Sequence, residues 1–388
     1  MGGCQQKDIS FESFMANFPK TDIDNDTEII NALKKTKLPI LIYGVGDVAN
    51  AICEYLYRFD IFVSAFFVDS LYHRLDNFRG MPCYSLEDAL CRFNQCNVII
   101  GFTNYKDGIK TLSTHKKVNE IYCFANPYAT STQQLTYDFF NENSHKFYQA
   151  YKLFDEQFSK DLFMAYIRSQ IYRNAKELFA FNWKSKKTDS SHNAFFNNDI
   201  IHLNDSEIYF DGGAFDGKDI QEFISSVNNY HQIFAVEPDS YNYNILKSRC
   251  SSALNIEMHQ LALWDSSTLL TFESDKGQQS GVAEQLTSGG ITVKADKIDN
   301  ILAGRPITLL KLNIRASEYK ALDGASETIQ KYQPKIICFI SIANDSLFSL
   351  PKLISKIHPE YSFYLRCDYP MFFRVYLYAV KKRGNVDV

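Results

Sequence analysis

The sequence predicts an α/β protein made of two Rossmann-like units that a helical connector joins. Three observations support this fold class. Short apolar runs alternate with helical patterns twice along the 388 residues, a glycine-rich turn follows the first run each time, and the stretch between the two parts is helical and contains neither Pro nor Gly. The predicted domains are a lead-in at 1–36, a Rossmann-like nucleotide-binding-type domain at 37–130, the connector and a loop at 131–200, and a second open-sheet domain at 201–388.

The amino-acid composition excludes several kinds of partner and binding site. The formal net charge is −4 and no basic block or stripe is present, so nucleic acid is not an expected partner. The nine cysteines form no C-x-x-C pair and the eight histidines are dispersed, which predicts neither a disulfide framework nor a metal site. No secretion signal follows Met1 and no apolar run reaches the ~20 residues that span a bilayer, so we expect a cytoplasmic protein without a membrane span.

The first unit starts after a polar, partly helical lead-in. Pro39–Tyr43 predicts a strand, the residues from Ala49 to Arg58 a helix, and Ile61–Val68 a second strand that ends at Asp69. Further apolar runs at 98–100 and 121–124 predict two more parallel strands. The turn between the first strand and helix reads G-x-G-x-x-A, so with the acidic strand end it predicts a second possible nucleotide site at Gly44, Gly46 and Asp69. Its ligand would be a nicotinamide cofactor or a nucleotide sugar; the alternative is an accessory domain that binds nothing.

The connector shows apolar residues at helical spacing from about 133 to 182. We therefore expect two or more helices there, followed by a polar loop from Lys184 to Asn198. Its many aromatic residues suit packing within one chain or between two copies, so a homo-oligomer is possible.

The second unit repeats the alternation of strands and helices. Apolar runs at 208–210, 233–236, 309–312 and 336–340 predict parallel strands. The last two runs, 361–365 and 375–380, leave little room for a helix between them. They predict an antiparallel pair that closes the sheet.

A glycine loop with an acidic start follows the first strand of this unit. Asp211 suits the cationic amino group of a methionine moiety better than a phosphate, and the glycines allow a tight turn before a helix that starts near Lys218. About twenty residues later Glu237 ends the next strand, where a carboxylate accepts hydrogen bonds from ribose hydroxyls. The alternative is a glycine turn without a ligand. The pattern predicts an S-adenosylmethionine site with these cofactor-binding residues: Asp211, Gly212, Gly213, Ala214, Asp216, Gly217, Glu237, Pro238, Asp239 and Ala262.

These motifs resemble the FkbM family of methyltransferases over about residues 205 to 380. The resemblance rests on D-G-G-A-F-D-G from Asp211, A-V-E-P-D from Ala235, A-L-W-D from Ala262, and the stretches 310–313, 318–334 and 359–366. It implies a class I fold, S-adenosylmethionine as methyl donor, and O-methylation of a sugar hydroxyl on a glycan, a polysaccharide or a nucleotide-sugar precursor, with no metal or redox cofactor. Members with an N-terminal Rossmann-like domain share the whole layout.

The chain departs from the family after the fourth strand. Where the family reads K-x-D-(V/I)-E-G-A-E, this chain keeps Lys311 and Glu318 but carries Asn313, Arg315 and Ala316. The predicted catalytic residues are Lys311, Asn313 and Glu318, although a neutral amide takes no proton at pH 7. A second departure, at Ser341–Asp345, removes another candidate base.

Three functions remain open on these residues. The first is an O-methyltransferase that relies on positioning of an activated donor. The second is a catalytically diverged binding or scaffold subunit of a glycan-modifying pathway. The third is an oxidoreductase that acts on nucleotide sugars through the N-terminal domain.

Five further residues have competing interpretations. His259 is a core or edge residue, or a base; Trp264 stacks on adenine or packs; and Asp265 reaches the adenine amino group. Arg366 and Arg374 either bind an anionic acceptor or form surface salt bridges.

Overall fold

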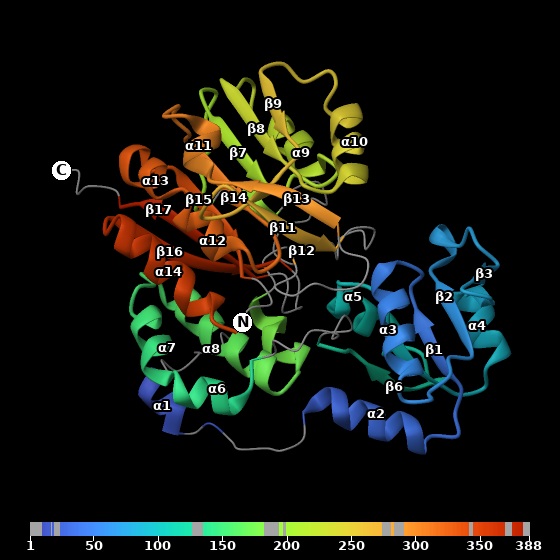
Figure 1. Ribbon diagram of the computed structural model, residues 1–388. Coiled ribbons are helices and arrows are strands. Elements are labelled where there is room, and N and C mark those ends of the chain that lie inside the picture. Colours follow the sequence, from blue (N-terminus) through green and yellow to red (C-terminus); the bar gives the residue numbers. More distant parts are fainter. Residues whose placement is uncertain are drawn as a thin grey trace. The chain divides into compact units, whose positions relative to one another are not determined.

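The computed structural model describes residues 10–16, 18, 24–125, 135–181, 194–196, 199–273, 281–282, 291–340, 344–368 and 375–382 (Figure 1). The chain divides into two compact units. The first comprises Met1–Phe139, Met164–Lys184 and Cys367–Arg374, and the second comprises Phe140–Phe163, Ser185–Arg366 and Val375–Val388. In this division the connector is not a unit of its own, because its helices are shared between the two.

The sheet of the first unit has the strand order β3-β4-β2-β1-β5-β6. All neighbours pair in parallel except β3, which pairs antiparallel with β4. The order of the parallel strands reverses between β1 and β5, so the open-sheet prediction is confirmed. The strands are β1 (Ile40–Tyr43), β2 (Ala65–Val68), β3 (Asn77–Phe78), β4 (Met81–Ser85), β5 (Cys96–Ile100) and β6 (Val118–Tyr122).

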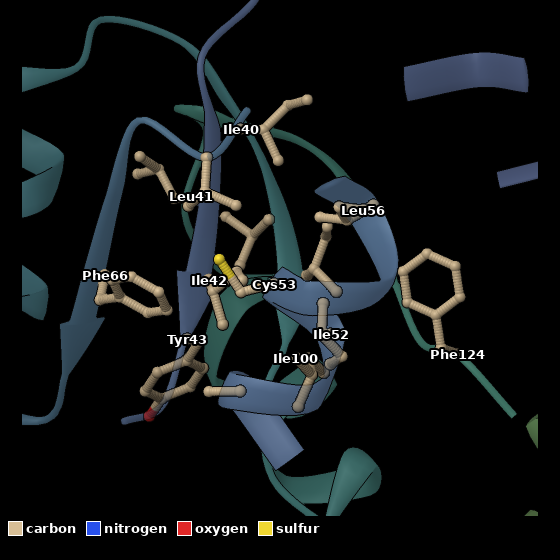
Figure 2. Close-up of a cluster of buried hydrophobic side chains, with 14 of the residues drawn as sticks. Ile40, Leu41, Ile42, Tyr43, Ile52, Cys53, Leu56, Phe66, Ile100 and Phe124 are labelled. Atoms are coloured by element: carbon tan, nitrogen blue, oxygen red, sulfur yellow. The ribbon is translucent and has the colours of Figure 1, made fainter. Parts of the chain in front are cut away.

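Buried side chains of the first unit pack between this sheet and its helices. All residues of β1, β2 and β5 are buried, which explains why these strands are continuous apolar runs rather than alternating ones. Figure 2 shows Ile42 on β1 beside Ile52 and Cys53 of helix α3. The helices are α1 (Phe11–Ala16), α2 (Asn25–Lys35), α3 (Asp47–Tyr57), α4 (Leu86–Arg92) and α5 (Tyr105–Leu112), with a short 3-10 turn η1 (Ser70–Tyr72).

The predicted second strand is half as long as its apolar run. Ile61 and Val63 are buried in the core but lie outside any strand, so burial rather than pairing explains their apolar character. The β3–β4 hairpin was not predicted, because β3 is very short and Pro82 interrupts the apolar residues of β4.

The predicted connector is helical, as expected. Its elements are α6 (Tyr137–Glu142), α7 (Ser144–Tyr151), α8 (Gln157–Ile171) and the 3-10 helix η2 (Ala175–Phe181). At the start of α8 the Ser159 hydroxyl accepts a hydrogen bond from the Leu365 N–H at 2.8 Å. This bond holds the beginning of α8 to the edge of the second unit's sheet.

The sheet of the second unit has the order β16-β17-β15-β14-β7-β8-β9. Parallel pairs join β7 to β8 and β14, β8 to β9, and β14 to β15, whereas β17 is antiparallel to β15. The last two apolar runs form β16 and β17, which are neighbours at the closing edge of the sheet as predicted. The strands are β7 (Ile208–Gly212), β8 (Gln232–Val236), β9 (Ile256–His259), β14 (Leu309–Leu312), β15 (Lys335–Phe339), β16 (Tyr361–Cys367) and β17 (Val375–Lys381).

Helices follow most strands of this sheet (Figure 1). They are α9 (Lys218–Ser226), α10 (Ser240–Arg249), α11 (Ile298–Leu302), α12 (Glu318–Asp323), α13 (Ser326–Tyr332) and α14 (Ser346–Ile357). A further 3-10 turn spans Ala194–Phe196.

A second, smaller sheet was not predicted. Its order is β10-β13-β11-β12, with β10 (Ala262–Leu263), β11 (Thr268–Glu273), β12 (Gly281–Val282) and β13 (Ile291–Asp296). Exposed Leu269 and Ile291 lie on it, and its buried cluster, as far as the structure describes these strands, consists of Ala262, Val293 and Ala295. So small an apolar face gives little periodicity for a sequence to reveal.

The described ranges contain neither a membrane-spanning helix nor a metal-binding cluster. None of their helices is long and apolar enough to cross a bilayer. Within the same residues no group of His, Cys, Asp or Glu side chains is arranged to hold a metal ion.

Candidate functional site

Three loops of the second unit meet where the strand order reverses. Strand β7 lies between β8 and β14, and in open α/β sheets the crevice outside such carboxyl ends binds ligands. Hydrogen bonds tie the three ends together. The Gly213 and Ala214 N–H groups both donate to the Val236 carbonyl at 3.0 Å, and the Asn313 N–H donates to the Gly212 carbonyl at 3.0 Å.

The glycine loop lies in direct contact with the end of β14. Gly213 has φ +80°, and a Cβ built there would stand 2.2 Å from the Asn313 carbonyl oxygen. Gly217 has φ +83°, and its Cβ would meet the Cys250 Sγ at 2.9 Å. Any other residue would be strained and would clash, so both positions require glycine. The tight turn predicted from the glycines is present.

A buried ion pair joins the start of this loop to β14. The Lys311 Nζ lies 2.8 Å from Asp211 Oδ1, and neither side chain is exposed. The same ammonium lies 2.8 Å from Asp219 Oδ2 on α9 and donates to the Gly213 carbonyl at 3.2 Å. Burial opposes its charge, but the carboxylates of Asp211 and Asp219 together raise the pKa of Lys311. The amine is therefore a fixed cation.

One carboxylate oxygen of Asp211, Oδ2, lacks a well-placed hydrogen-bond donor. Burial raises the pKa of Asp211, although the Lys311 ammonium acts in the opposite direction. The Tyr209 phenol lies beside Asp211 and acts to lower its pKa, but Oδ2 makes no hydrogen bond of good geometry to a described residue. The nearby Tyr209 phenol is also fully buried, and burial raises the pKa of that hydroxyl well above its usual value. A buried carboxylate oxygen without a donor is costly, so a ligand with a cationic donor group would suit this position.

Glu237 is a second buried carboxyl at the end of β8. Its Oε2 accepts a hydrogen bond from the Phe215 N–H and its Oε1 one from the Asp239 N–H, both at 2.9 Å. Burial raises the pKa of Glu237 to about 7 despite these two donors. Each oxygen keeps a lone pair that can accept another hydrogen bond, for example from a ribose hydroxyl.

Other predicted binding residues have protein partners. Asp239 caps α10 by accepting a hydrogen bond from the Asn242 N–H at 2.9 Å. Asp216 forms an ion pair with Arg249 and accepts from the Lys218 N–H at 3.2 Å. Ala262 lies in the core of the small sheet and Pro238 is half-buried. These four residues shape the surroundings of the loop, and a direct contact with a ligand stays a prediction.

The loop after β14 carries the departures from the family pattern. Asn313 and Arg315 are half-buried, whereas Ala316 is exposed. Arg315 and Ala316 both have left-handed backbones, with φ +52° and +71°. Glu318 is buried, and its Oε1 accepts a hydrogen bond from the Ile314 N–H at 2.9 Å. The turn is thus held from within by Glu318.

The structure places Trp264 and Asp265 beside Lys320. The Lys320 Nζ lies 5.6 Å from the centre of the Trp264 ring and 2.5 Å from Asp265 Oδ2. This ion pair lowers the pKa of Asp265. His259 on β9 lies 2.8 Å from Glu257. A role for any of them in binding stays a prediction.

Arg366 corrects one expectation. The predicted salt bridge is present, with Glu156, but the Arg366 side chain is buried rather than on the surface and so is not free for an anionic acceptor. Arg374 and Ser341 to Ala343 lie outside the described residues.

Two site residues were missed from the sequence. Asp219, in the first turn of α9, shares the Lys311 ammonium with Asp211. The Phe195 ring lies 4.9 Å from the same nitrogen. An acidic residue in a first helical turn is a general feature, so no local signal distinguishes Asp219.

The residues of the second predicted site come together in the first unit. Gly44 and Gly46 form the turn after β1, and Asp69 follows β2, the neighbouring strand. The Tyr43 hydroxyl donates a hydrogen bond to Asp69 Oδ1 at 2.5 Å.

Comparison with known families identifies the second unit. Residues 211–366 match the family described as Methyltransferase FkbM domain. The chain carries a methyltransferase domain of the FkbM family. The match begins at Asp211 and ends at Arg366, so this FkbM domain contains the glycine loop, the acidic strand end and the loop after β14.

Among solved structures, methyltransferase FkbM from Methylobacillus flagellatus KT shares the fold. It is 17% identical, and the match covers 95% of this chain and 98% of that one at a TM-score of 0.65. Aeropyrum pernix fibrillarin with natively bound S-adenosyl-L-methionine is 10% identical over 48% of this chain and 73% of that one, at a TM-score of 0.31. An rRNA methylase from Streptococcus thermophilus is 12% identical over 47% and 90%, also at 0.31. No curated protein matches the chain.

Proposed function

We propose that the FkbM domain binds S-adenosylmethionine at the carboxyl ends of β7, β8 and β14 and methylates a sugar hydroxyl of a glycan, a polysaccharide or a nucleotide-sugar precursor. One observation carries the proposal. Asp211 is fully buried at the point where the strand order reverses, and its Oδ2 makes no hydrogen bond of good geometry to a described residue, although the Tyr209 phenol lies beside it. A cationic amino group supplies that hydrogen bond.

The residues present fit this donor molecule. Asp211 would hold its amino group and Glu237 its ribose hydroxyls, since both are buried acceptors at neighbouring strand ends. Gly213 lets the loop pack closely against the end of β14, because a side chain there would clash with the Asn313 carbonyl. When bound, S-adenosylmethionine would supply an activated methyl group: its carbon–sulfur bond breaks as the carbon–oxygen bond to the acceptor forms, S-adenosylhomocysteine is the leaving group, and the hydroxyl proton passes to solvent.

The loop after β14 offers little general-base chemistry. Lys311 is a fully buried cation and has no lone pair for a proton. Asn313 accepts a hydrogen bond but not a proton, and Glu318 Oε1 is engaged by the Ile314 N–H. We therefore assign catalysis mainly to positioning of the acceptor against an activated donor, which can supply a large part of the rate enhancement.

The sugar acceptor is supported by the family resemblance rather than by a contact. The test is methyl transfer from S-adenosylmethionine to a panel of nucleotide sugars and oligosaccharides, with mass spectrometry of the products. A singly methylated sugar that disappears in Glu237→Ala supports the proposal. Transfer to amines or carboxylates but never to hydroxyls contradicts it.

A second candidate, a diverged binding or scaffold subunit, is favoured by the loss of two carboxylates at Asn313 and Arg315. The double variant Asn313→Asp with Arg315→Glu separates the candidates. If the wild-type chain binds the donor without turnover and the double variant gains turnover, the loss of carboxylates has silenced the enzyme. If both transfer methyl groups at similar rates, catalysis by positioning is supported.

A further inference from the structure

The turn after β1 in the first unit contains two glycines with different reasons to be there. Gly44 has φ +126°, and a Cβ would stand 2.8 Å from the Gly101 carbonyl oxygen. Backbone conformation and packing therefore both require a glycine. This residue lets the chain turn sharply from β1 towards α3, close to the end of β5, where the strand order reverses.

Gly46 is a glycine that the fold does not need. Its φ of −97° and ψ of −167° are extended angles that any residue adopts, and a Cβ built on it meets nothing within 4 Å. It is also the N-cap residue of α3 and makes no side-chain cap, although Ser, Thr, Asp or Asn would stabilise the helix start. What a glycine gains here is open space above the backbone for something outside the chain.

Ala49 completes the small-residue pattern. A Cβ on Gly101 would stand 2.8 Å from the Ala49 Cβ, so α3 packs very closely on β5. The first helical hydrogen bond runs from the Asn50 N–H to the Gly46 carbonyl at 3.0 Å. The N–H groups of residues 47–49 precede that ladder and lie at the positive end of the helix.

Asp69 is held in place at the end of the neighbouring strand. Its Oδ1 accepts the Tyr43 hydroxyl, whose ring stacks on Phe67 at 4.7 Å and meets Phe102 edge-on at 4.9 Å. Burial and the Asp69 carboxylate raise the pKa of Tyr43, so the phenol stays a donor. Asp69 Oδ2 makes no other hydrogen bond to a described residue, and a fixed carboxylate at this place suits ribose hydroxyls.

Apolar side chains are exposed immediately after Asp69. Leu71 is 79% exposed, Tyr72 64% and Leu75 50%, and the first two lie on the turn η1. Isolated exposed apolar residues are common, but three within five positions leave apolar surface uncovered next to a fixed carboxylate. A planar base is a ligand group that exposed apolar and aromatic side chains accommodate.

We propose that the first unit binds a nucleoside diphosphate, independently of the methyl-donor site. The diphosphate lies against the open backbone of Gly46 and the start of α3, the ribose on Asp69, and the base against Leu71 and Tyr72. This chemistry is common to dinucleotide cofactors and nucleotide sugars.

The test is calorimetric titration of the full chain with ADP, UDP, NAD+ and UDP-glucose, each with saturating S-adenosylhomocysteine to block the donor site. Binding of at least one nucleotide is expected. Tighter binding of NAD+ than of UDP-glucose assigns the site to a dinucleotide, and the reverse order assigns it to a nucleotide sugar. Absence of binding for all four up to millimolar concentration overturns the proposal, as does binding only when S-adenosylhomocysteine is left out.

Gly46→Asp separates binding from folding. Aspartate is a favoured N-cap residue and has room at this position, so the melting temperature should stay or rise while the new carboxylate repels the diphosphate. Affinity should fall by about tenfold or more, and Asp69→Asn should have a similar effect through the lost charged acceptor. Thr114→Asp adds the same charge at an exposed position after α5. It should change neither the melting temperature nor the nucleotide affinity. Unchanged nucleotide affinity in Gly46→Asp would contradict the proposal.

Discussion

The Lys311 ammonium lies between two carboxylates, 2.8 Å from Asp211 Oδ1 and 2.8 Å from Asp219 Oδ2. It connects β14, the loop after β7 and helix α9 through one charge. Since Lys311 and Asp211 are fully buried, removal of one partner leaves an uncompensated charge in the core. This relation makes Lys311 a structural support of the donor loop in our proposal.

Lys311→Met should lower the free energy of unfolding by about 3–5 kcal/mol, because Asp211 and Asp219 lose their shared cation. Chemical denaturation measures this change. Lys320→Met removes the exposed ion pair with Asp265 and should cost less than about 1 kcal/mol. Equal losses in the two variants would mean that the buried pair contributes no more than a surface one.

Glu237 should make stability depend on pH. Burial raises its pKa from 4.5 to about 7, so its protonated form is favoured by folding. The contribution is complete below pH 4.5 and is lost as the pH rises through 7. Relative to Glu237→Gln, which does not titrate, the wild type should lose up to about 3 kcal/mol between pH 5 and pH 8. Parallel stability curves for the two proteins would rule out the raised pKa.

The same carboxyl should make donor affinity depend on pH. Ribose hydroxyls need the ionised form of Glu237, so S-adenosylmethionine should bind about tenfold more weakly at pH 6 than at pH 8. Titrations of wild type and Glu237→Gln across this range measure it. The variant should bind weakly with a flat profile, and an equal slope in both would assign the dependence to another group.

Gly213→Ala should damage the donor loop more than its backbone angle alone explains. Gly304 has nearly the same φ, +82° against +80°, but a Cβ there meets nothing within 4 Å. Gly304→Ala therefore measures the cost of strain, about 1–2 kcal/mol, and Gly213→Ala adds the clash with the Asn313 carbonyl. We expect the larger loss of stability, and loss of donor binding, only in Gly213→Ala. Equal effects in thermal melts would show that the loop relaxes freely.

Ala316→Gly should stabilise the protein by about 1 kcal/mol. Ala316 has φ +71° and is exposed, so glycine relieves strain without opening a cavity. Ala253, which is half-buried, lies outside any helix and is not among the residues with positive φ, is the control and should lose stability on the same change because glycine gives the unfolded chain more freedom. Destabilisation in both variants would show that the left-handed turn stores no strain.

Most strands of the two large sheets could be predicted because they are buried apolar runs, unlike the partly exposed strands β3 and β4. Leu309–Leu312 forms β14 with the predicted bounds. The small sheet escaped prediction because its strands are short and largely exposed. Ile61 and Val63 caused the opposite error in the strand prediction, because they are buried without belonging to a strand.

In the candidate site, sequence motifs predicted the residues that lie at or directly after the end of a strand. The loop from Asp211 and the acid at Glu237 follow their strands directly, so spacing brings them to one edge. Asp219 and the closure of Lys311 into a buried ion pair depend on three-dimensional packing. The burial of Arg366 could not be predicted for the same reason, because its salt-bridge partner Glu156 is distant in sequence.

The central claim is tested most directly by calorimetric titration of the purified chain with S-adenosylmethionine and S-adenosylhomocysteine. We expect binding in the micromolar range that is lost in Asp211→Ala and Glu237→Ala, with circular dichroism to verify that both variants are folded. Lys320→Met should bind as the wild type does. Well-folded wild-type protein that binds neither molecule at millimolar concentration would contradict the methyl-donor site.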